Sequence, residues 1–70
     1  MHRVPVISSV IASVGYSSRR RQLEVEFRTG AVYEYMNVPP EVHEHLIAAD
    51  SLGRYFNMAI RDVYPCRQRH

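Results

Sequence analysis

The sequence has 70 residues, 46% of them hydrophobic, and this length allows one domain near the lower limit for a core that folds without disulfides or metals. A net charge of +2 is too small to indicate a nucleic-acid partner by itself, although all nine of the lysine or arginine positions hold arginine. The single cysteine, Cys66, excludes an internal disulfide, which is typical of a reducing compartment and predicts a cytoplasmic protein. No stretch reaches the roughly 20 apolar residues of a membrane span, so we expect no membrane partner.

The first predicted strand covers residues 9–16, whose β-branched and partly alternating side chains favour an extended backbone. Within it, Gly15 indicates a bulge or a close approach of another segment. Residues 1–8 form a short arm with Pro5, which suits a sheet edge. Residues 17–21 are a polar turn into the next strand, and a connection this short favours antiparallel neighbours.

A hairpin over residues 22–35 organises the rest of the chain. Leu23, Val25 and Phe27 alternate with polar residues, which is the period-two pattern of a strand with one buried face. The loop that follows has three residues and ends at Gly30, the position that needs a positive φ. Loop length therefore predicts the register of the return strand.

The return strand carries Tyr33 and Tyr35, and a three-residue loop places both on the apolar face. Glu34 then lies opposite Glu24 on the other face, which also carries Glu26 and is predicted to be acidic and to repel phosphate. A two-residue loop would bury Glu34 without a partner, so we reject that register. Because the tyrosines face the core, they are not predicted to form an exposed stacking platform for RNA bases.

Two helices are predicted after Pro39 and Pro40, which stop the sheet and suit a first helical turn. The first helix has apolar residues at i, i+4 and i+7: Val42, Leu46 and Ala49. The second, capped by Asp50 or Ser51, has a longer apolar stripe: Leu52, Tyr55, Phe56, Ala59, Ile60 and Val63.

This order of elements predicts an α+β fold in which a three-stranded antiparallel meander is covered on one face by two C-terminal helices. We expect a single domain over residues 1–70, with a core at about 6–64. After Pro65 ends the second helix, residues 65–70 are predicted to be a flexible basic tail.

Several short patterns resemble those of the KTSC domain family: Ser8-Ser9-x-Ile11, Val14-Gly15-Tyr16, Gly30-x-Val32-Tyr33-x-Tyr35 and Ser51-x-Gly53-x-Tyr55-Phe56-Asn57-x-x-Ile60-Arg61. The resemblance covers about residues 6–64, and it departs at Ser17, where many relatives carry Asp. Members of that family are similar small bacterial and phage proteins, or a C-terminal appendage of some lysyl-tRNA synthetases. The synthetase association implies RNA binding, and the resemblance brings no defined catalytic residues.

Five arginines are candidate RNA contacts. The densest positive charge lies in the turn before residue 22, where the phosphate-binding candidates are Arg19, Arg20 and Arg21. Arg54 and Arg61 are seven residues apart and share a helix face, so they form a second candidate contact. Arg54 can pair with Asp50, whereas Arg61 has no acid at i−3 or i−4. The alternative is that the turn is merely solvated and the helix arginines form structural ion pairs.

Other candidate sites are weaker. Ser51 and Gly53, at the start of the second helix, can present free backbone N–H groups to an anion, although capping explains Ser51 equally well. His43 and His45 point to different helix faces, so no metal site is expected.

The serines and Cys66 lack an activating base, so we expect a binding module that is not an enzyme and has no cofactor. The alternative to RNA is a protein partner or a homo-oligomer, formed through the acidic face and an open edge on the third strand.

Overall fold

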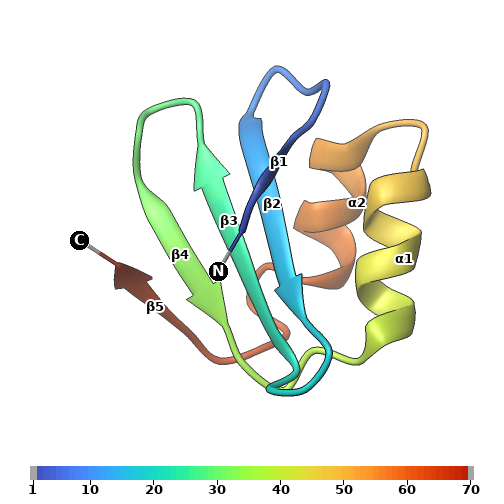
Figure 1. Ribbon diagram of the computed structural model, residues 1–70. Helices are drawn as coiled ribbons and strands as arrows, with labels where there is room; N and C mark the ends of the chain where they lie inside the picture. Colours follow the sequence, from blue (N-terminus) through green and yellow to red (C-terminus); the bar gives the residue numbers. More distant parts are fainter. Residues whose placement is uncertain (1, 70) are drawn as a thin grey trace.

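A five-stranded antiparallel sheet, in the order β1-β2-β3-β4-β5, is packed against two helices in the computed structural model, which describes residues 2–69 (Figure 1). The elements are β1 (Val4–Pro5), β2 (Ile11–Ser17), β3 (Gln22–Phe27), β4 (Val32–Tyr35), α1 (Pro40–Ala48), α2 (Leu52–Ala59) and β5 (Cys66–Arg69). The predicted α+β class with two helices on an antiparallel sheet is confirmed. The predicted strand number was wrong, because a strand is added at each edge of the expected meander.

The β3–β4 hairpin has the predicted register, with three facing pairs: Leu23 with Tyr35, Glu24 with Glu34, and Val25 with Tyr33. The N–H of Phe27 donates to the carbonyl of Ala31 over 2.8 Å and closes the loop. Gly30 has a φ of 96°. The loop therefore uses glycine where a side chain would be strained.

Strand β2 begins at Ile11, two residues later than predicted, and its irregularity lies between Ile11 and Ser13. Gly15 is not a bulge, because it pairs regularly with Glu24. The irregularity changes the alternation so that Ile11 and Val14 both belong to the core. Strict alternation would have placed Ile11 and Val14 on opposite faces of the strand.

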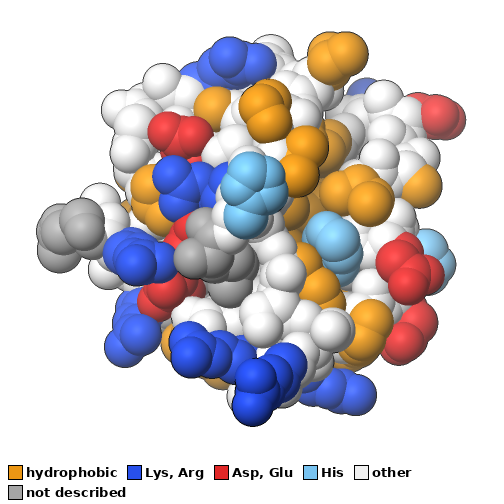
Figure 2. Space-filling view, in the orientation of Figure 1, with side chains coloured by type: hydrophobic (Ala, Val, Ile, Leu, Met, Phe, Trp, Pro, Cys, Tyr) orange, Lys and Arg blue, Asp and Glu red, His pale blue; other side chains and the backbone are white. Residues whose placement is uncertain are grey.

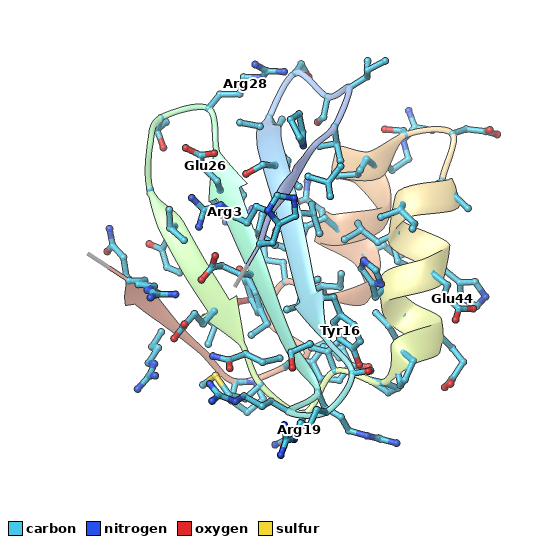
Figure 3. The ribbon with its side chains drawn as sticks, viewed as in Figure 1. Arg3, Tyr16, Arg19, Glu26, Arg28 and Glu44 are labelled. Atoms are coloured by element: carbon cyan, nitrogen blue, oxygen red, sulfur yellow. The ribbon has the colours of Figure 1, made fainter. Side chains whose placement is uncertain are left out.

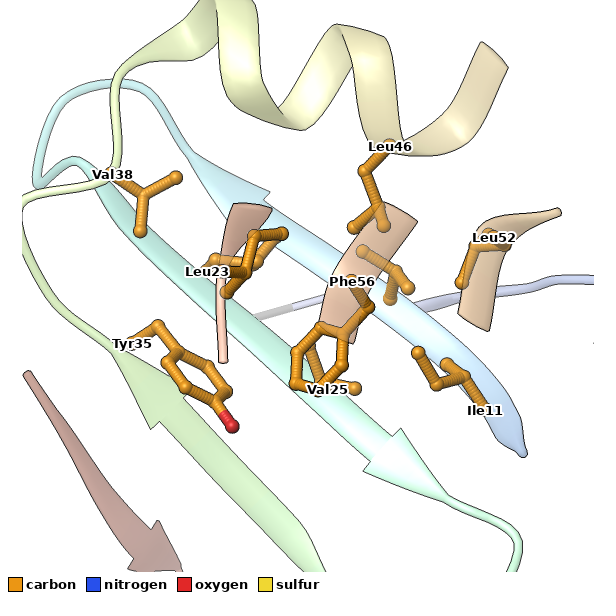
Figure 4. Packing of buried hydrophobic residues seen from close by; sticks show 10 residues of the cluster. Ile11, Leu23, Val25, Tyr35, Val38, Leu46, Leu52 and Phe56 are labelled. Carbon is orange, nitrogen blue, oxygen red and sulfur yellow. The ribbon is translucent and has the colours of Figure 1, made fainter. Parts of the chain in front are cut away.

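The core lies between the sheet and the helices, and Figure 4 shows Leu46 and Phe56 directed from α1 and α2 toward the strands. Its buried members are Ile11, Val14, Leu23, Val25, Tyr35, Val38, Leu46, Leu52, Phe56 and Ile60. The predicted stripe of the second helix was wrong only at Val63, which is 57% exposed. That position lies beyond the helix, since α2 ends at Ala59 and Asp62 adopts a φ of 61°.

Residues 66–69, predicted as a flexible tail, instead form β5 along the outer edge of β4. The Nε of Arg67 donates to Glu34 over 2.9 Å, and Nη1 of Arg69 donates to Glu24 over 2.6 Å. Strand β4 is therefore not the open edge that was predicted. The remaining tail residue, His70, lies outside the described residues.

The outer face of the sheet holds an Arg–Glu network made of Arg3, Glu24, Glu34, Arg67 and Arg69. Both carboxylates are buried: Glu24 is 0% exposed and Glu34 is 7% exposed. Arg3 reaches Glu24 from the N-terminal arm, while the other two arginines come from β5. The predicted acidic, phosphate-repelling face was wrong, because arginines from both ends of the chain neutralise these carboxylates.

Candidate functional site

The turn between β2 and β3 carries three exposed arginines: Arg19, Arg20 and Arg21. Among residues 2–69, none of their guanidinium groups takes part in an ion pair. The carbonyl of Arg21 accepts the N–H of Val38 over 2.9 Å, which ties the turn to the segment between β4 and α1. Figure 3 shows Arg19 at this end of the sheet, and Figure 2 shows arginine side chains gathered there. These groups are free to contact an anion.

The two helix arginines lie at opposite ends of α2. Arg54 is in the first turn, beside the connection from α1, whereas Arg61 follows the C-terminal end of the helix. Because α2 ends at Ala59, Arg61 lies beyond the helix, and the two arginines do not share a helix face as predicted. Both are exposed, and neither forms an ion pair within the described part of the chain, so the expected pairing of Arg54 with Asp50 is not made. The structure therefore separates the two helix arginines, one at each end of α2.

The start of α2 is capped, as the sequence predicted. The hydroxyl of Ser51 accepts the backbone N–H of Arg54 over 3.3 Å. A cleft of about 450 Å³ adjoins this turn and is lined partly by Gly53 and Ser8, but the Ser8 hydroxyl already accepts the N–H of Ile11. Capping therefore accounts for the Ser51 hydroxyl.

A second cleft, which the sequence did not predict, opens between the β3–β4 hairpin, the end of α2 and the start of β5. Its volume is about 440 Å³, and we call it the aromatic cleft; it is lined by Val10, Phe27, Tyr33, Tyr35, Phe56, Asn57, Arg61, Asp62 and Cys66. Four of these side chains are aromatic rings that meet edge to face. Ring centroids are 5.8 Å apart for Phe27 and Tyr33, and 5.5 Å apart for both the Phe27–Phe56 and Tyr35–Phe56 pairs.

The two tyrosines of β4 differ in how far they reach the cleft. Tyr35 is only 5% exposed, whereas Tyr33 is half-buried, and both belong to the face that packs on the helices, as predicted. Among the described residues, every buried polar side-chain atom has a hydrogen-bond partner. The Tyr35 hydroxyl has none, so its oxygen is not buried but is accessible from the cleft. Burial raises the pKa of Tyr35 to about 12, with smaller contributions from Cys66 and Tyr33. The hydroxyl therefore stays protonated and can donate a hydrogen bond at neutral pH.

His43 of α1 takes part in the packing of that helix. His43 stacks on Tyr16 with ring centroids 4.7 Å apart, and burial lowers the pKa of His43. The hydroxyl of Tyr16 donates to the carbonyl of Val38 over 2.6 Å, so this pair supports the packing of α1. Within residues 2–69, no three His, Cys, Asp or Glu side chains are grouped to hold a metal ion. Neither described helix is long and apolar enough to cross a membrane.

Comparison with known proteins places the chain in a family. The sequence pattern of the KTSC domain matches residues 7–64. The chain belongs to the KTSC domain family. An uncharacterized protein of Stutzerimonas stutzeri is 51% identical to this KTSC domain over 61 residues, which are 87% of this chain and 86% of that protein.

The KTSC domain also resembles a crystal structure and a group of larger proteins. A KTSC domain protein of Yersinia pestis has the same fold, with a TM-score of 0.96 and 39% sequence identity over 99% of this chain and 97% of that one. The lysine–tRNA ligase of Nostoc punctiforme is 42% identical over 60 residues, which are 86% of this chain but 11% of the ligase. The family and the fold are therefore established, and the ligase likeness concerns a small part of a longer protein.

The patterns on which the family resemblance rested converge in space. Tyr33 and Tyr35 come from the hairpin, whereas Phe56, Asn57 and Arg61 come from α2 and its C-terminal end, and all five line the aromatic cleft. The sequence predicted core positions for the two tyrosines and a separate contact for Arg61. The tyrosine pattern of the hairpin and the Phe56-Asn57-x-x-Ile60-Arg61 pattern were the available signal for the cleft, but only the packing of α2 on β4 brings the two patterns together.

Proposed function

We propose that this KTSC domain is a small non-catalytic module that binds RNA weakly and with little sequence preference. The observation that carries the proposal is the group of adjacent exposed arginines without ion partners at one end of the sheet: Arg19, Arg20 and Arg21. Guanidinium groups bind phosphate oxygens through forked hydrogen bonds, and such contacts carry little sequence information. The likeness to part of lysine–tRNA ligases supports a tRNA-related context.

Two further features support an anionic partner. Arg61, just after the C-terminal end of α2, and Arg54, in its first turn, are candidates for a second contact. The buried carboxylates Glu24 and Glu34 are paired with arginines, so they do not set up the repulsive face that the sequence suggested. The domain has a net charge of +2, and three of the six arginines that form no ion pair among residues 2–69 lie together in the β2–β3 turn.

The test is a titration of fluorescent tRNA, and of random single-stranded RNA, at two salt concentrations. We expect the Arg19/Arg20/Arg21→Ala variant to bind more weakly and to flatten the slope of log K against log[salt] by ~0.7 for each lost contact with single-stranded RNA, or ~2 in all. Undetectable binding of wild type at low salt would reject RNA binding. Retained binding with an unchanged slope would reject these arginines as the site.

A matched pair of single variants controls for loss of charge alone. Arg19→Gln removes one charge at the turn, and Arg28→Gln removes one charge at the opposite end of the sheet (Figure 3). If the turn is the site, the first variant loses affinity and the second loses little. Equal losses would indicate a diffuse attraction to the whole positive surface.

A further inference from the structure

The aromatic cleft plays no part in phosphate binding at the β2–β3 turn, yet it has the size and chemistry of a ligand site. Its volume of about 440 Å³ lies in the ~300–1,000 Å³ range of small-molecule pockets, which are mostly apolar with a few placed polar groups. Here the apolar part is aromatic, and half-buried Tyr33 offers ring surface at the opening. A planar aromatic ligand suits these walls.

The polar groups of the cleft supply both donors and acceptors without partners of their own. The Tyr35 hydroxyl is an open donor, the Asn57 amide can donate and accept, and the Asp62 carboxylate accepts. Among residues 2–69, no hydrogen bond or ion pair engages the side chains of Asn57 and Asp62. The edge of an unpaired nucleobase carries the same mixture of donors and acceptors.

Charge distinguishes the candidate occupants. Arg61 and Asp62 both line the cleft without ion partners among the described residues, so a ligand that combines a flat ring, a hydrogen-bond donor for Asp62 and an anion for Arg61 is favoured over a purely apolar one. A nucleotide has these parts in one unit, whereas an apolar side chain of a protein partner would leave Arg61 unused. We propose that the aromatic cleft holds one unpaired RNA base against Tyr33, with Asn57 at the base edge and Arg61 at its phosphate. This site rests on the proposed RNA binding and adds base contact to it.

Single nucleotides provide the test, because they can occupy the cleft without spanning to the turn. We would titrate adenosine 5′-monophosphate and, separately, ribose 5-phosphate into the ¹⁵N-labelled full chain and follow amide and Asn57 side-chain NMR signals. One stacked base and one phosphate contact predict an affinity on the order of millimolar. We expect saturable shifts at Tyr33, Tyr35 and Asn57 with the nucleotide, and no such shifts with ribose 5-phosphate.

Variants at exposed positions of α2 and its end test the assignment without disturbing the core. Asn57→Ala and Arg61→Gln should each weaken nucleotide binding about three- to ten-fold, because each removes one hydrogen-bonding group. Met58→Ala is the matched control, since this neighbour is 72% exposed and does not line the cleft. Equal affinity in all three variants would overturn the site.

The outcomes separate this inference from the proposed function. Nucleotide shifts confined to residues 18–21 would overturn the base site and leave RNA binding through the turn intact. If the NMR signals of cleft residues shift saturably with the nucleotide but tRNA does not bind, the proposed function is rejected and the cleft is supported as a nucleotide site. As a further probe we would titrate free tyrosine amide, which mimics an aromatic side chain of a protein partner. If it caused the same NMR shift changes in the cleft as the nucleotide, the occupant would be a protein segment and the assignment to a base would be overturned.

Discussion

Replacing Glu24 with glutamine would measure what the Arg–Glu network contributes to stability. The carboxylate is fully buried and accepts hydrogen bonds from Arg3 and, over 2.6 Å, from Arg69. Glutamine has nearly the same size and keeps one acceptor oxygen, so the substitution removes the charge without leaving a cavity. The change in the free energy of unfolding therefore reports on the electrostatic interaction.

We expect the free energy of unfolding to fall by about 1.5–3 kcal/mol, which is the net contribution of one hydrogen bond to a charged group. This is less than the ~3–5 kcal/mol lost when a fully buried ion pair loses one partner. The reason is that the side chains of Arg3 and Arg69 are 30% and 52% exposed, so water can solvate them after the carboxylate is gone. For a domain of this size the melting temperature should fall by roughly 10 °C.

The effect should depend on pH in a defined direction. Burial by itself would raise the pKa of Glu24, but the hydrogen bonds from Arg3 and Arg69 outweigh it and hold the pKa below the ordinary value of 4.5. A carboxyl with a depressed folded-state pKa stabilises the fold above its unfolded pKa, and this contribution is lost as pH falls through the folded pKa. Wild type and the Glu24→Gln variant should therefore converge in stability in acid.

Urea unfolding followed by circular dichroism, at about pH 7 and about pH 3, measures both effects. Glu26→Gln is the control, because Glu26 accepts a hydrogen bond from the Ser13 hydroxyl over 2.8 Å and has no arginine partner. That variant should lose about 1 kcal/mol or less. The reasoning is refuted if Glu24→Gln has the same free energy of unfolding as wild type at neutral pH, or if the loss of free energy of unfolding is as large in acid as at neutral pH.

The same unfolding assay checks two further substitutions in the hairpin. Tyr35→Ala should cost about 3–5 kcal/mol, because it deletes a ring that is 5% exposed and packs on Phe56, whereas Tyr35→Phe keeps the ring and should cost far less. An unchanged curve for the alanine variant would mean that this ring is not part of the core. Gly30→Ala should cost about 1–2 kcal/mol, because φ is 96° while the surrounding space is open, so only backbone strain is added. Thr29→Ala next to it removes only a long, exposed hydrogen bond of 3.4 Å from the N–H of Ala31, so it should cost less than Gly30→Ala, and equal losses from these two loop variants would argue against strain.

The sequence by itself determined the hairpin and the apolar faces of the helices. Alternation at Leu23 and Val25 fixed one buried face, and Gly30 fixed the loop length, so both tyrosines of β4 could be assigned to the helix side of the sheet. The apolar stripe that includes Leu52 and Phe56 could also be predicted, because helical spacing alone decides which side chains share a face. These features depend on residues close together in the chain.

Only the tertiary structure decided β5, the Arg–Glu network and the aromatic cleft. Cys66–Arg69 has no apolar alternation, and it is a strand because the edge of β4 offers unpaired backbone groups and the buried carboxylates require cations. The arginines that satisfy Glu24 lie 21 residues before it and 45 after it, at Arg3 and Arg69. Spacing patterns report which residues share a face of one element, whereas the pairing of a strand edge and the neutralisation of a buried charge depend on which distant groups the folded chain brings within reach.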